Sequence, residues 1–424
     1  MISQLESRLA HFLTMDAQRG RQRRRPEVTQ SSATTLMLDG RRLVNFSSND
    51  YLGLSHHPEV IEAVQRAAHD EGAGGTSSAL VSGYRAGHRA LEQALADFTG
   101  REAALVFSSG FLANLAVIST LFGRDDVLIT DRLNHASLQD AAMLSRARLL
   151  RFAHNDVSAL RARLETARTQ SRGLCAVITD GVFSMDGDLA PLSEMVAALG
   201  ESTVMVVDDA HGIGVVGHRG RGSVAGYGLG QSQIPILTAT FGKSLGGNGA
   251  FVAGSAQLIE VLVQRARPYI YTTALAPTSV AAVRTSLAIL EREHCLRDQL
   301  QQNIVTFRRG AAAHDIPLMD SFTPIQPLKV GTGQQAMALR DFLATHGFWV
   351  QAIRPPTVPE GTARLRITLT AAHRVEDVKN LIHALAQAKA SGLLSPPIFS
   401  TPGVTRTEEH GVAPNSVTVS ELDG

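Results

Sequence analysis

The feature of the sequence that most constrains the fold is a repeated alternation of short apolar segments with helix-length ones, from residue 103 to residue 243. The apolar segments are AALVF, DVLIT, CAVITDGVFS and VMVVDD, followed by a fifth that ends at Thr240. Short apolar strands separated by helices predict a mainly parallel sheet covered on both faces. We therefore expect an α/β fold with this sheet in a large domain.

Residues suited to binding a ligand follow each of these predicted strands. In chain order they are Gly110, His135, Ser184, Asp208 with His211, and the segment from Thr240 to Lys243. Because the carboxyl ends of parallel strands meet at one edge of a sheet, where ligands of such folds bind, we expect these residues to converge. Their convergence indicates a site more strongly than any one of them does.

Lys243 and Asp208 suggest which ligand this edge binds. Lys243 lies in a glycine-bounded turn, and a lysine in a dry, cationic setting can lose its proton and form a Schiff base. Asp208 ends an apolar strand, where it could face a protonated ring nitrogen with an attraction of roughly 5 kcal/mol at ~3 Å and an effective dielectric of ~20. These two groups together hold pyridoxal phosphate, with His211 in reach of its phenolic oxygen and Thr240 in reach of its phosphate.

Other interpretations of the same residues are open. The helix start at Gly110-Phe111 could bind a phosphate, but such starts are common. His135 could stack on a flat ring or be an ordinary loop histidine. Asp208 and His211 have the spacing of metal ligands but lack a third ligand nearby, so we expect no metal. The Walker pattern is excluded around Lys243, because the first glycine of GxxxxGK is missing.

Composition excludes several classes of protein. With 424 residues, 44% of them hydrophobic, the chain can bury a large core, and a net charge of +1 offers no general attraction for nucleic acid or an acidic membrane. Cys175 and Cys295 are widely separated and are interpreted as buried thiols in a reducing compartment. No apolar run reaches the roughly 18 residues that span a bilayer. The amino terminus lacks the apolar core of a signal peptide, so we expect a cytoplasmic protein.

The amino-terminal region carries two further patterns. Apolar residues recur at helical spacing in residues 2–18, so we expect an amphipathic helix whose stripe is covered by the body or by a second subunit. The stripe consists of Ile2, Leu5, Leu9, Phe12 and Leu13. The arginine-rich run Arg19–Pro26 could be a solvated turn, a contact for a phosphate or carboxylate of a substrate, or, less favoured, a nucleic-acid contact. A hairpin with its turn at Asp39-Gly40 follows.

The chain is expected to divide into four parts. They are an N-terminal helix and hairpin in residues 1–47, the large domain in 48–285, a smaller α+β domain in 286–390, and a disordered tail in 391–424. In the large domain, Pro58 begins a helix and the glycine-rich segment 74–88 is expected to be a long flexible connection. The smaller domain should contain strands in IQPLKV, FWVQAI and RLRITLT and a last helix from about Val375 to Ala390.

A resemblance to a known family supports this interpretation. From Leu43 to Ala390 the chain resembles the α-oxoamine synthases, pyridoxal-phosphate enzymes with the aspartate-aminotransferase fold (fold type I). The resemblance rests on NFSSNDYLGLSHHP, SSGFLANLAV, DRLNHASLQDAA, RFAHNDV, DGVFSMDGDLAPL, VDDAHGIGVVG, GRGS, TFGKSLGGNGA and AIRPPTVPEGTARLRITLTAAH. The Arg-Pro-Pro-Thr form in the last of these is similar to the oxononanoate-forming branch more than to the glycine-using relatives.

The resemblance implies a role for each matched residue. Lys243 would be the Schiff-base lysine and the acid/base, Asp208 the partner of the ring nitrogen, and His211 the contact of the phenolic oxygen. His135 would stack on the ring and contact the substrate. The remaining implied cofactor-binding residues are Gly110, Phe111, Ser184 and Thr240. The implied substrate-binding residues are Arg354 for the amino-acid carboxylate, Asn49 and Thr357 in the pocket, and Arg23.

The resemblance also implies a reaction and partners. The reaction would be the decarboxylative condensation of L-alanine with a pimeloyl thioester, carried on coenzyme A or on acyl carrier protein, to give 8-amino-7-oxononanoate in biotin biosynthesis. The chain would form a homodimer with shared active sites, in which Thr272-Thr273 could reach the neighbour's phosphate. The alternative is a glycine-using sister enzyme that makes 2-amino-3-oxobutyrate or 5-aminolevulinate. A catalytically silent subunit is disfavoured because Lys243 is present.

Overall fold

A seven-stranded sheet lies at the centre of the computed structural model, which describes residues 2–23, 25–200 and 202–394. The sheet has the order β4-β10-β9-β8-β7-β5-β6, and every neighbouring pair is parallel except those of β10, which is antiparallel to both β4 and β9. The strands are β4 (Ala103–Phe107), β5 (Val127–Asp131), β6 (Arg148–Phe152), β7 (Cys175–Asp180), β8 (Thr203–Asp208), β9 (Ile236–Thr240) and β10 (Ala250–Gly254). The predicted mainly parallel sheet is confirmed.

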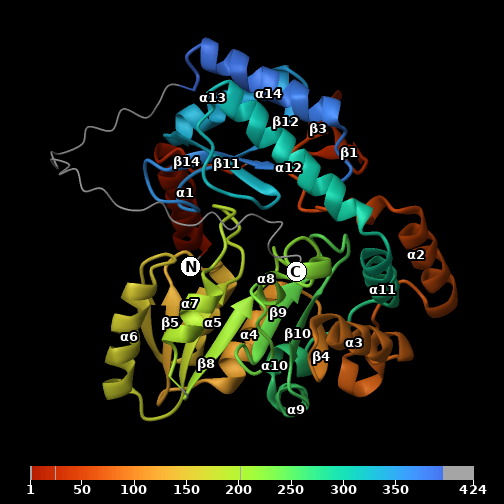
Figure 1. The fold of residues 1–424 in the computed structure, drawn as a ribbon, viewed down its shortest axis with the longest axis vertical. Helices are drawn as coiled ribbons and strands as arrows, with labels where there is room; N and C mark the ends of the chain where they lie inside the picture. Colours follow the sequence, from red (N-terminus) through yellow and green to blue (C-terminus); the bar gives the residue numbers. More distant parts are fainter. Residues whose placement is uncertain (1, 24, 201, 395–424) are drawn as a thin grey trace.

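Helices cover both faces of this sheet, which is why its strands read as continuous apolar runs. In β5, Leu128 packs in the core on one face and Ile129 in the core on the other. The first face is covered by α4 (Gly110–Leu121), α5 (Ala136–Ser145), α9 (Ala256–Arg265) and α10 (Arg267–Ile270). The second face is covered by α6 (Val157–Gln170), α7 (Leu192–Ala198) and α8 (Ser223–Gly226), and Figure 1 shows the sheet between these helices.

Two strands of the sheet were not predicted, for different reasons. β6 is an edge strand whose sequence, RLLRF, is interrupted by arginines and only partly buried, so it lacks the apolar signal of its neighbours. β10 is fully buried but follows directly on the glycine-rich turn, and its sequence, AFVAG, is short. Its antiparallel direction breaks the strand–helix alternation on which the prediction depended.

The smaller α+β region lies beside the large sheet. Strands β11 (Ile325–Gly331), β13 (Gln351–Ile353) and β14 (Ala363–Thr368) form an antiparallel sheet in the order β11-β14-β13. Its helices are α12 (Cys295–Ala313), α13 (Gly333–Thr345) and α14 (Val375–Ala390), labelled in the upper half of Figure 1. These elements confirm the strands predicted in IQPLKV and RLRITLT and the last helix, whereas only QAI of the predicted strand FWVQAI belongs to this sheet. The predicted boundary at residue 285 lies inside α11 (Pro277–Arg292), which packs on α2 (Pro58–Glu71) and on α3 (Ala86–Thr99).

The N-terminal hairpin has the predicted turn but does not stand alone. β2 (Thr35–Leu38) and β3 (Arg41–Asn45) are joined by Asp39-Gly40, both with positive φ, as a two-residue hairpin turn requires. β1 (Val28–Ser31) pairs with β2. β3 pairs in parallel with β12 (Phe348–Trp349), so the hairpin completes its sheet with the C-terminal region.

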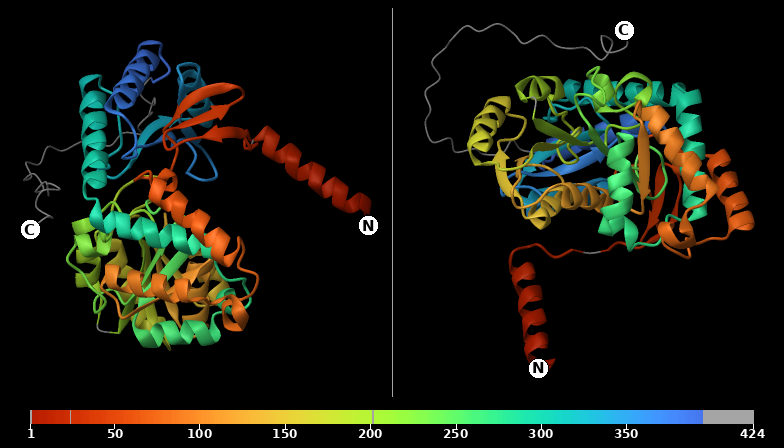
Figure 2. Two further views of the ribbon diagram at one scale, coloured as in Figure 1. Left: turned by 90° about the vertical axis from the view of Figure 1, so that its right-hand side faces the viewer. Right: turned by 90° about the horizontal axis from the view of Figure 1, so that it is seen from below.

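The predicted amino-terminal helix is confirmed as α1 (Ile2–Gln18), but its apolar stripe is not covered by the part of the chain that the structure describes. The five side chains of the stripe are 51–77% exposed, and α1 has no buried residue. Figure 2 shows α1 extending away from the body in both views. Of the two expected partners for the stripe, the body is therefore ruled out in this structure.

The segment 74–88 is not the long flexible connection that was predicted. Ala79–Gly83 form a π-helical turn, and α3 already begins at Ala86. A Cβ added to Gly83 would lie 2.3 Å from the carbonyl oxygen of Ser77 and 2.7 Å from Cβ of Ala274, so glycine is required there by close packing. Gly75 and Gly83 therefore serve close backbone contacts.

Three further expectations concern single residues and the tail. Both cysteines are free, but Cys175 is only partly buried and Cys295 is exposed, so the interpretation as buried thiols was wrong. Of the predicted tail, residues 395–424 lie outside the described residues, while Leu394 is buried against the core. None of the described helices is both long and apolar enough to cross a membrane.

Phe46 connects the N-terminal hairpin to the C-terminal region and provides a test of this packing. Its ring is fully buried and stacks on His373 at a centroid distance of 4.2 Å. We expect F46A to lower the free energy of unfolding by about 3–5 kcal/mol, because it leaves a cavity in the shared core. F322A, which removes a 57% exposed ring, should change it by less than about 1 kcal/mol in the same urea titration. Equal losses would contradict this assignment of the core.

Candidate active site

The carboxyl ends of the parallel strands bring the predicted residues to one edge of the sheet. Asp208, at the end of β8, pairs in register with Thr238 of β9 and with Asp180 of β7. A Cβ built on Gly110, the first residue of α4 after β4, would lie 3.7 Å from Cβ of Thr240, the last residue of β9. The expected convergence is therefore present in the structure.

Lys243 lies in the turn that follows β9. The turn is closed by hydrogen bonds from Gly246 N–H to the Lys243 carbonyl and from Gly247 N–H to the Phe241 carbonyl. Gly246 has a φ of +57°, and a Cβ there would lie 2.3 Å from the amide nitrogen of Ser55, so the tight turn requires glycine. The backbone path of this turn sets the position of Lys243.

The surroundings of Lys243 favour a neutral amine. Burial is the largest cause and lowers its pKa to about 8, against the opposite effect of the nearby carboxylates of Asp208 and Asp180. The positive charge of Arg366 lowers it further. A larger fraction of the amine is therefore unprotonated near neutral pH than for an ordinary lysine, which makes Lys243 a candidate nucleophile and base.

Asp208 is held in place through both carboxylate oxygens. Oδ2 accepts a hydrogen bond from Nδ2 of Asn114 at 2.6 Å, and Oδ1 accepts one from the N–H of Ala210 at 3.0 Å. Asn114 is itself fixed, because its Oδ1 accepts a hydrogen bond from the Thr238 hydroxyl at 2.7 Å. The carboxylate thus has a defined orientation, as a partner for a protonated ring nitrogen would need.

Asn114 was not predicted, although the sequence carries a signal for it. It is 2% exposed and is a polar residue in the apolar helix α4, GFLANLAVISTL. A buried polar side chain requires hydrogen-bond partners, so its position in an otherwise apolar helix near the site indicates a structural or functional contact.

The two predicted histidines lie on this same edge. His211 is buried, and its Nδ1 lies 2.6 Å from the hydroxyl of Tyr51. Burial lowers the pKa of His211 well below its usual value, and the charges of Lys243 and Arg366 add to this, so the ring is neutral. His135 caps α5 and is exposed, with its N–H donating to Asp180 at 2.8 Å. Desolvation lowers the pKa of His135 as well.

A phosphate could bind at the start of α4. Ser109 caps this helix by accepting a hydrogen bond from Leu112 N–H, and the free N–H groups of the first turn favour an anion. Thr240 lies beside Gly110, although its hydroxyl donates to the Gly249 carbonyl at 2.9 Å. Phe111 is 42% exposed. The helix start, the buried amine of Lys243 with its lowered pKa and the fixed carboxylate of Asp208 together fit pyridoxal phosphate.

Arg366, in β14, reaches this group from the smaller region. It is 7% exposed, its Nε donates to the Ser184 carbonyl at 2.6 Å, and its Nη1 donates to Oδ1 of Asn49 at 3.0 Å. It therefore binds two of the predicted residues and lowers the pKa of Lys243 and of His211. The sequence prediction missed it. The sequence signal for Arg366 is an arginine inside the apolar strand RLRITLT, because burying a charge is unfavourable unless the charge is paired or hydrogen-bonded.

The other substrate-binding residues predicted from the resemblance lie outside this group. Arg354 donates from Nη1 and Nη2 to the backbone carbonyls of Gly20 and Gln22, so its guanidinium is bound to the N-terminal segment. Arg23 is exposed on that segment. Thr357 lines a neighbouring cavity of about 370 Å³. The structure therefore places Arg366, and not Arg354, close enough to Lys243 to influence its pKa.

His154 forms part of the wall of this cavity. Burial opposes its protonation, but hydrogen bonds to Asp131 at 3.1 Å and to Asp188 at 2.8 Å raise the pKa of His154 to about 10. His154, Asp186 and Asp188 have the spacing of metal ligands, but a protonated histidine cannot bind a metal and Asp186 is paired with Arg364. We interpret the group as a structural ion-pair network.

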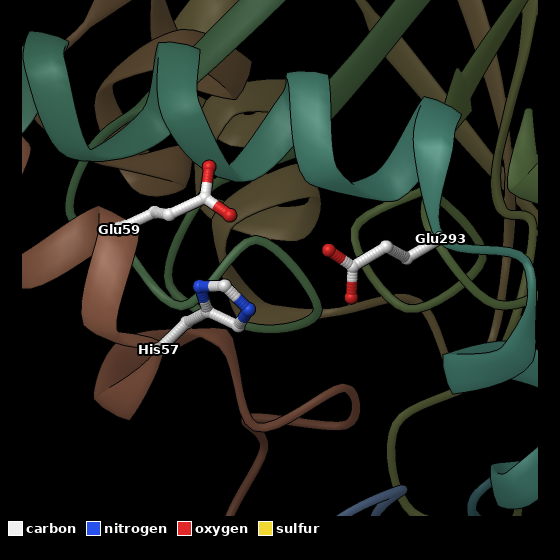
Figure 3. A group of neighbouring side chains, drawn as sticks. All are labelled: His57, Glu59 and Glu293. Carbon is white, nitrogen blue, oxygen red and sulfur yellow. The ribbon is translucent and has the colours of Figure 1, made fainter.

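A second group with ligand spacing lies far from the cavity. His57, Glu59 and Glu293 face one another in Figure 3. Both carboxylates are already bound by Arg292, whose Nη2 lies 2.7 Å from each of them. The guanidinium of Arg292 thus already serves as the cation that holds the two carboxylates together.

The raised pKa of His154 gives a pH dependence of stability with a defined sign. The folded protein keeps a proton that the unfolded chain releases above pH 6.5, so the stabilisation is complete below pH 6.5 and is lost as the pH rises towards 10. We expect the difference in unfolding free energy between the wild type and H154Q to shrink over this range. H69Q, at an exposed site on α2, gives the baseline. A difference that grew with pH would contradict the ion-pair network.

Known proteins were compared with the chain. Residues 41–385 match the sequence model of the class I and II aminotransferases. The chain is 51% identical to an 8-amino-7-oxononanoate synthase of Pseudomonas paraeruginosa, covering 86% of this chain and 90% of the relative. It is 50% identical to one of Methylococcus capsulatus, covering 90% of this chain and 97% of the relative.

Solved structures agree with these relatives. Sphingomonas wittichii serine palmitoyltransferase superposes with a TM-score of 0.86 at 33% identity, covering 93% of this chain and 100% of the other. An S. paucimobilis serine palmitoyltransferase with bound PLP gives 0.86 at 32%, covering 93% and 99%. A Francisella tularensis 8-amino-7-oxononanoate synthase gives 0.73 at 31%, covering 82% and 98%. The chain therefore belongs to the class I and II aminotransferase family, on the branch of the 8-amino-7-oxononanoate synthases.

Proposed function

We propose that this chain is a pyridoxal-phosphate-dependent acyltransferase of biotin biosynthesis. It condenses L-alanine with a pimeloyl thioester and releases 8-amino-7-oxononanoate, carbon dioxide and the free thiol. The observation that supports the proposal is that two groups lie at the same edge of the sheet. They are the amine of Lys243, whose pKa is lowered to about 8, and the carboxylate of Asp208, which is fixed by hydrogen bonds. The substrates are those that the names of the relatives imply.

Different residues of the site would contact different parts of the cofactor. Lys243 would bind its aldehyde carbon, Asp208 its ring nitrogen and His211 its phenolic oxygen, while His135 would lie on the ring face. Gly110, Phe111, Ser184 and Thr240 would contact the remainder, with the start of α4 nearest the phosphate. The cofactor supplies a sink for the electrons left when a bond to the α-carbon of the amino acid breaks.

Lys243 would also transfer the α-proton of the amino-acid substrate. With its amine free, Lys243 could take the α-proton of the amino acid and later return it. An acid–base group works best with a pKa near the operating pH, and the lowered pKa of Lys243 meets this requirement. The neutral ring of His211, bound to Tyr51, donates or accepts hydrogen bonds without adding a charge.

Arg366 is placed to bind the carboxylate of alanine. Hydrogen bonds from Nε to the Ser184 carbonyl and from Nη1 to Asn49 and Thr368 fix the plane of the guanidinium. A guanidinium held in this way can bind a carboxylate with high geometric specificity. Asn49, which binds Nη1 of Arg366, would then contact the substrate pocket as well.

A homodimer with shared active sites accompanies this proposal. Large apolar side chains are exposed near the catalytic edge, among them Phe111 at 42%, Tyr271 at 71% and Val81 at 79%. Exposed apolar groups of this kind favour an interface between subunits. Thr272-Thr273, next to Tyr271, would reach the phosphate bound by the neighbour. The acyl donor would be pimeloyl-coenzyme A or pimeloyl-acyl carrier protein.

The reaction is tested by product identification. Purified enzyme is incubated with alanine or glycine and with pimeloyl-coenzyme A, and the products are identified by mass spectrometry. We expect 8-amino-7-oxononanoate from alanine. Efficient turnover of glycine with a short acyl thioester, and none with alanine, would instead identify one of the glycine-using sister enzymes.

The role of Lys243 is tested without an assay of activity. Borohydride makes the bond between a lysine and pyridoxal phosphate permanent, so the treated wild type should gain the mass of one cofactor per chain, on the peptide that contains Lys243. K243R keeps the charge but should gain no such mass. Labelling of K243R to the same extent would show that another amine holds the cofactor.

The role of Arg366 is tested against that of Arg354. We expect R366Q to raise the KM for alanine about 10- to 100-fold, because an ionic hydrogen bond contributes roughly 1.5–3 kcal/mol. R354Q should leave this KM within about twofold, since its guanidinium is bound to backbone carbonyls. The reverse order of effects would restore Arg354 as the carboxylate partner.

A further inference from the structure

Arg354 joins two segments that are distant in the sequence. Its Nη1 donates to the carbonyl of Gly20 and its Nη2 to the carbonyl of Gln22. Between these two residues, Nη2 of Arg21 lies 3.2 Å from Oε1 of Glu360. Three consecutive residues of the N-terminal segment are therefore held by the loop 354–360.

The N-terminal segment offers its carbonyls at a fixed position. α1 ends in a Schellman motif, in which Gly20 N–H donates to the Ala17 carbonyl at 3.0 Å and Arg21 N–H donates to the Asp16 carbonyl at 2.8 Å. Gly20 has a φ of +62°, which the motif requires. Because α1 buries no side chain against the body, the contacts of Arg354 and Glu360 are what hold the end of this helix against the loop.

The loop 354–360 is part of the cavity wall. Thr357, Val358 and Pro359 line the cavity. Thr357 N–H donates to the Arg354 carbonyl at 3.1 Å, which closes a turn and fixes the side chain of Arg354 relative to the lining residues. Gly333 lies under Arg354, since a Cβ built there would be 3.6 Å from Cβ of the arginine.

We propose that Arg354 and Glu360 form a clasp that holds the N-terminal segment at residues 20–22, and with it the neighbouring arginines, at the rim of the substrate cavity. The positive charges of Arg19, Arg23 and Arg25 then lie where the acyl thioester enters, and they bind its phosphate or carboxylate groups. This inference rests on the proposed function for the identity of the ligand. Arg354 is a positioning residue, acting through the backbone of the segment and without touching the substrate.

The clasp predicts a specific pattern of steady-state constants. R354Q should raise the KM for pimeloyl-coenzyme A about 10-fold, while kcat and the KM for alanine stay within about twofold. R354K should restore the KM for pimeloyl-coenzyme A only in part, because a single ammonium group cannot donate to both carbonyls as the planar guanidinium does. E360Q should have a smaller effect, about two- to threefold, since its ion pair is 30% and 79% exposed.

A second measurement follows the segment itself and does not need activity. Trypsin cleaves after arginine, so the rate at which the folded protein loses its first 20 or so residues, followed by intact mass, reports how firmly the segment is held. We expect cleavage at least about fivefold faster in R354Q than in the wild type, and protection by free coenzyme A in the wild type alone. R340Q removes an arginine paired with its neighbour Asp341 and should behave as the wild type.

The outcomes separate the clasp from the proposed reaction. A higher KM for alanine in R354Q with an unchanged KM for the thioester would overturn the clasp, because Arg354 would then contact the amino acid. Unchanged cleavage would overturn it as well. Absence of the expected product in the wild type would refute the proposed function, while the cleavage rates would still decide whether Arg354 holds the segment.

Discussion

The proposed chemistry depends on the burial of one amine, that of Lys243. Lys243 has a pKa of about 8 chiefly because it is buried, and the carboxylates of Asp208 and Asp180 limit how far that pKa falls. The balance needs the backbone turn around Gly246, which accepts no side chain, and an aspartate whose oxygens are already directed by Asn114 and by a backbone N–H. The large sheet supplies these groups because its parallel strands end at the same edge.

The smaller region completes the site through a single buried charge. Arg366 extends from β14 to the Ser184 carbonyl and to Asn49, and so connects three segments that are far apart in the sequence. Its desolvation is costly unless it is paired, and a substrate carboxylate would complete its hydrogen bonding. The same positive charge also lowers the pKa of Lys243, so under the proposed function one side chain would serve both recognition and acid–base chemistry.

Much of this arrangement could be predicted from the sequence, because strands buried on both faces leave a strong apolar signal. The five strands that end near the site, the hairpin turn at Asp39-Gly40 and the helix ends at Gly20 and Gly100 all follow from local rules. What could not be predicted depends on tertiary contacts. β6 and β10 lack a clear local pattern, Asn114 and Arg366 acquire their importance from partners distant in the chain, and the guanidinium of Arg354 is bound by carbonyls that no motif indicates.

The parallel pairing of β3 with β12 has a consequence for biosynthesis. Val44 pairs with Phe348, about 300 residues further along the chain. During synthesis, the N-terminal hairpin therefore cannot complete its sheet until most of the polypeptide has left the ribosome. Contacts of such long sequence range form slowly, and until then the buried faces of Leu36, Leu38 and Leu43 lie unprotected. The beginning of this protein is thus the part that a chaperone would need to shield for longest.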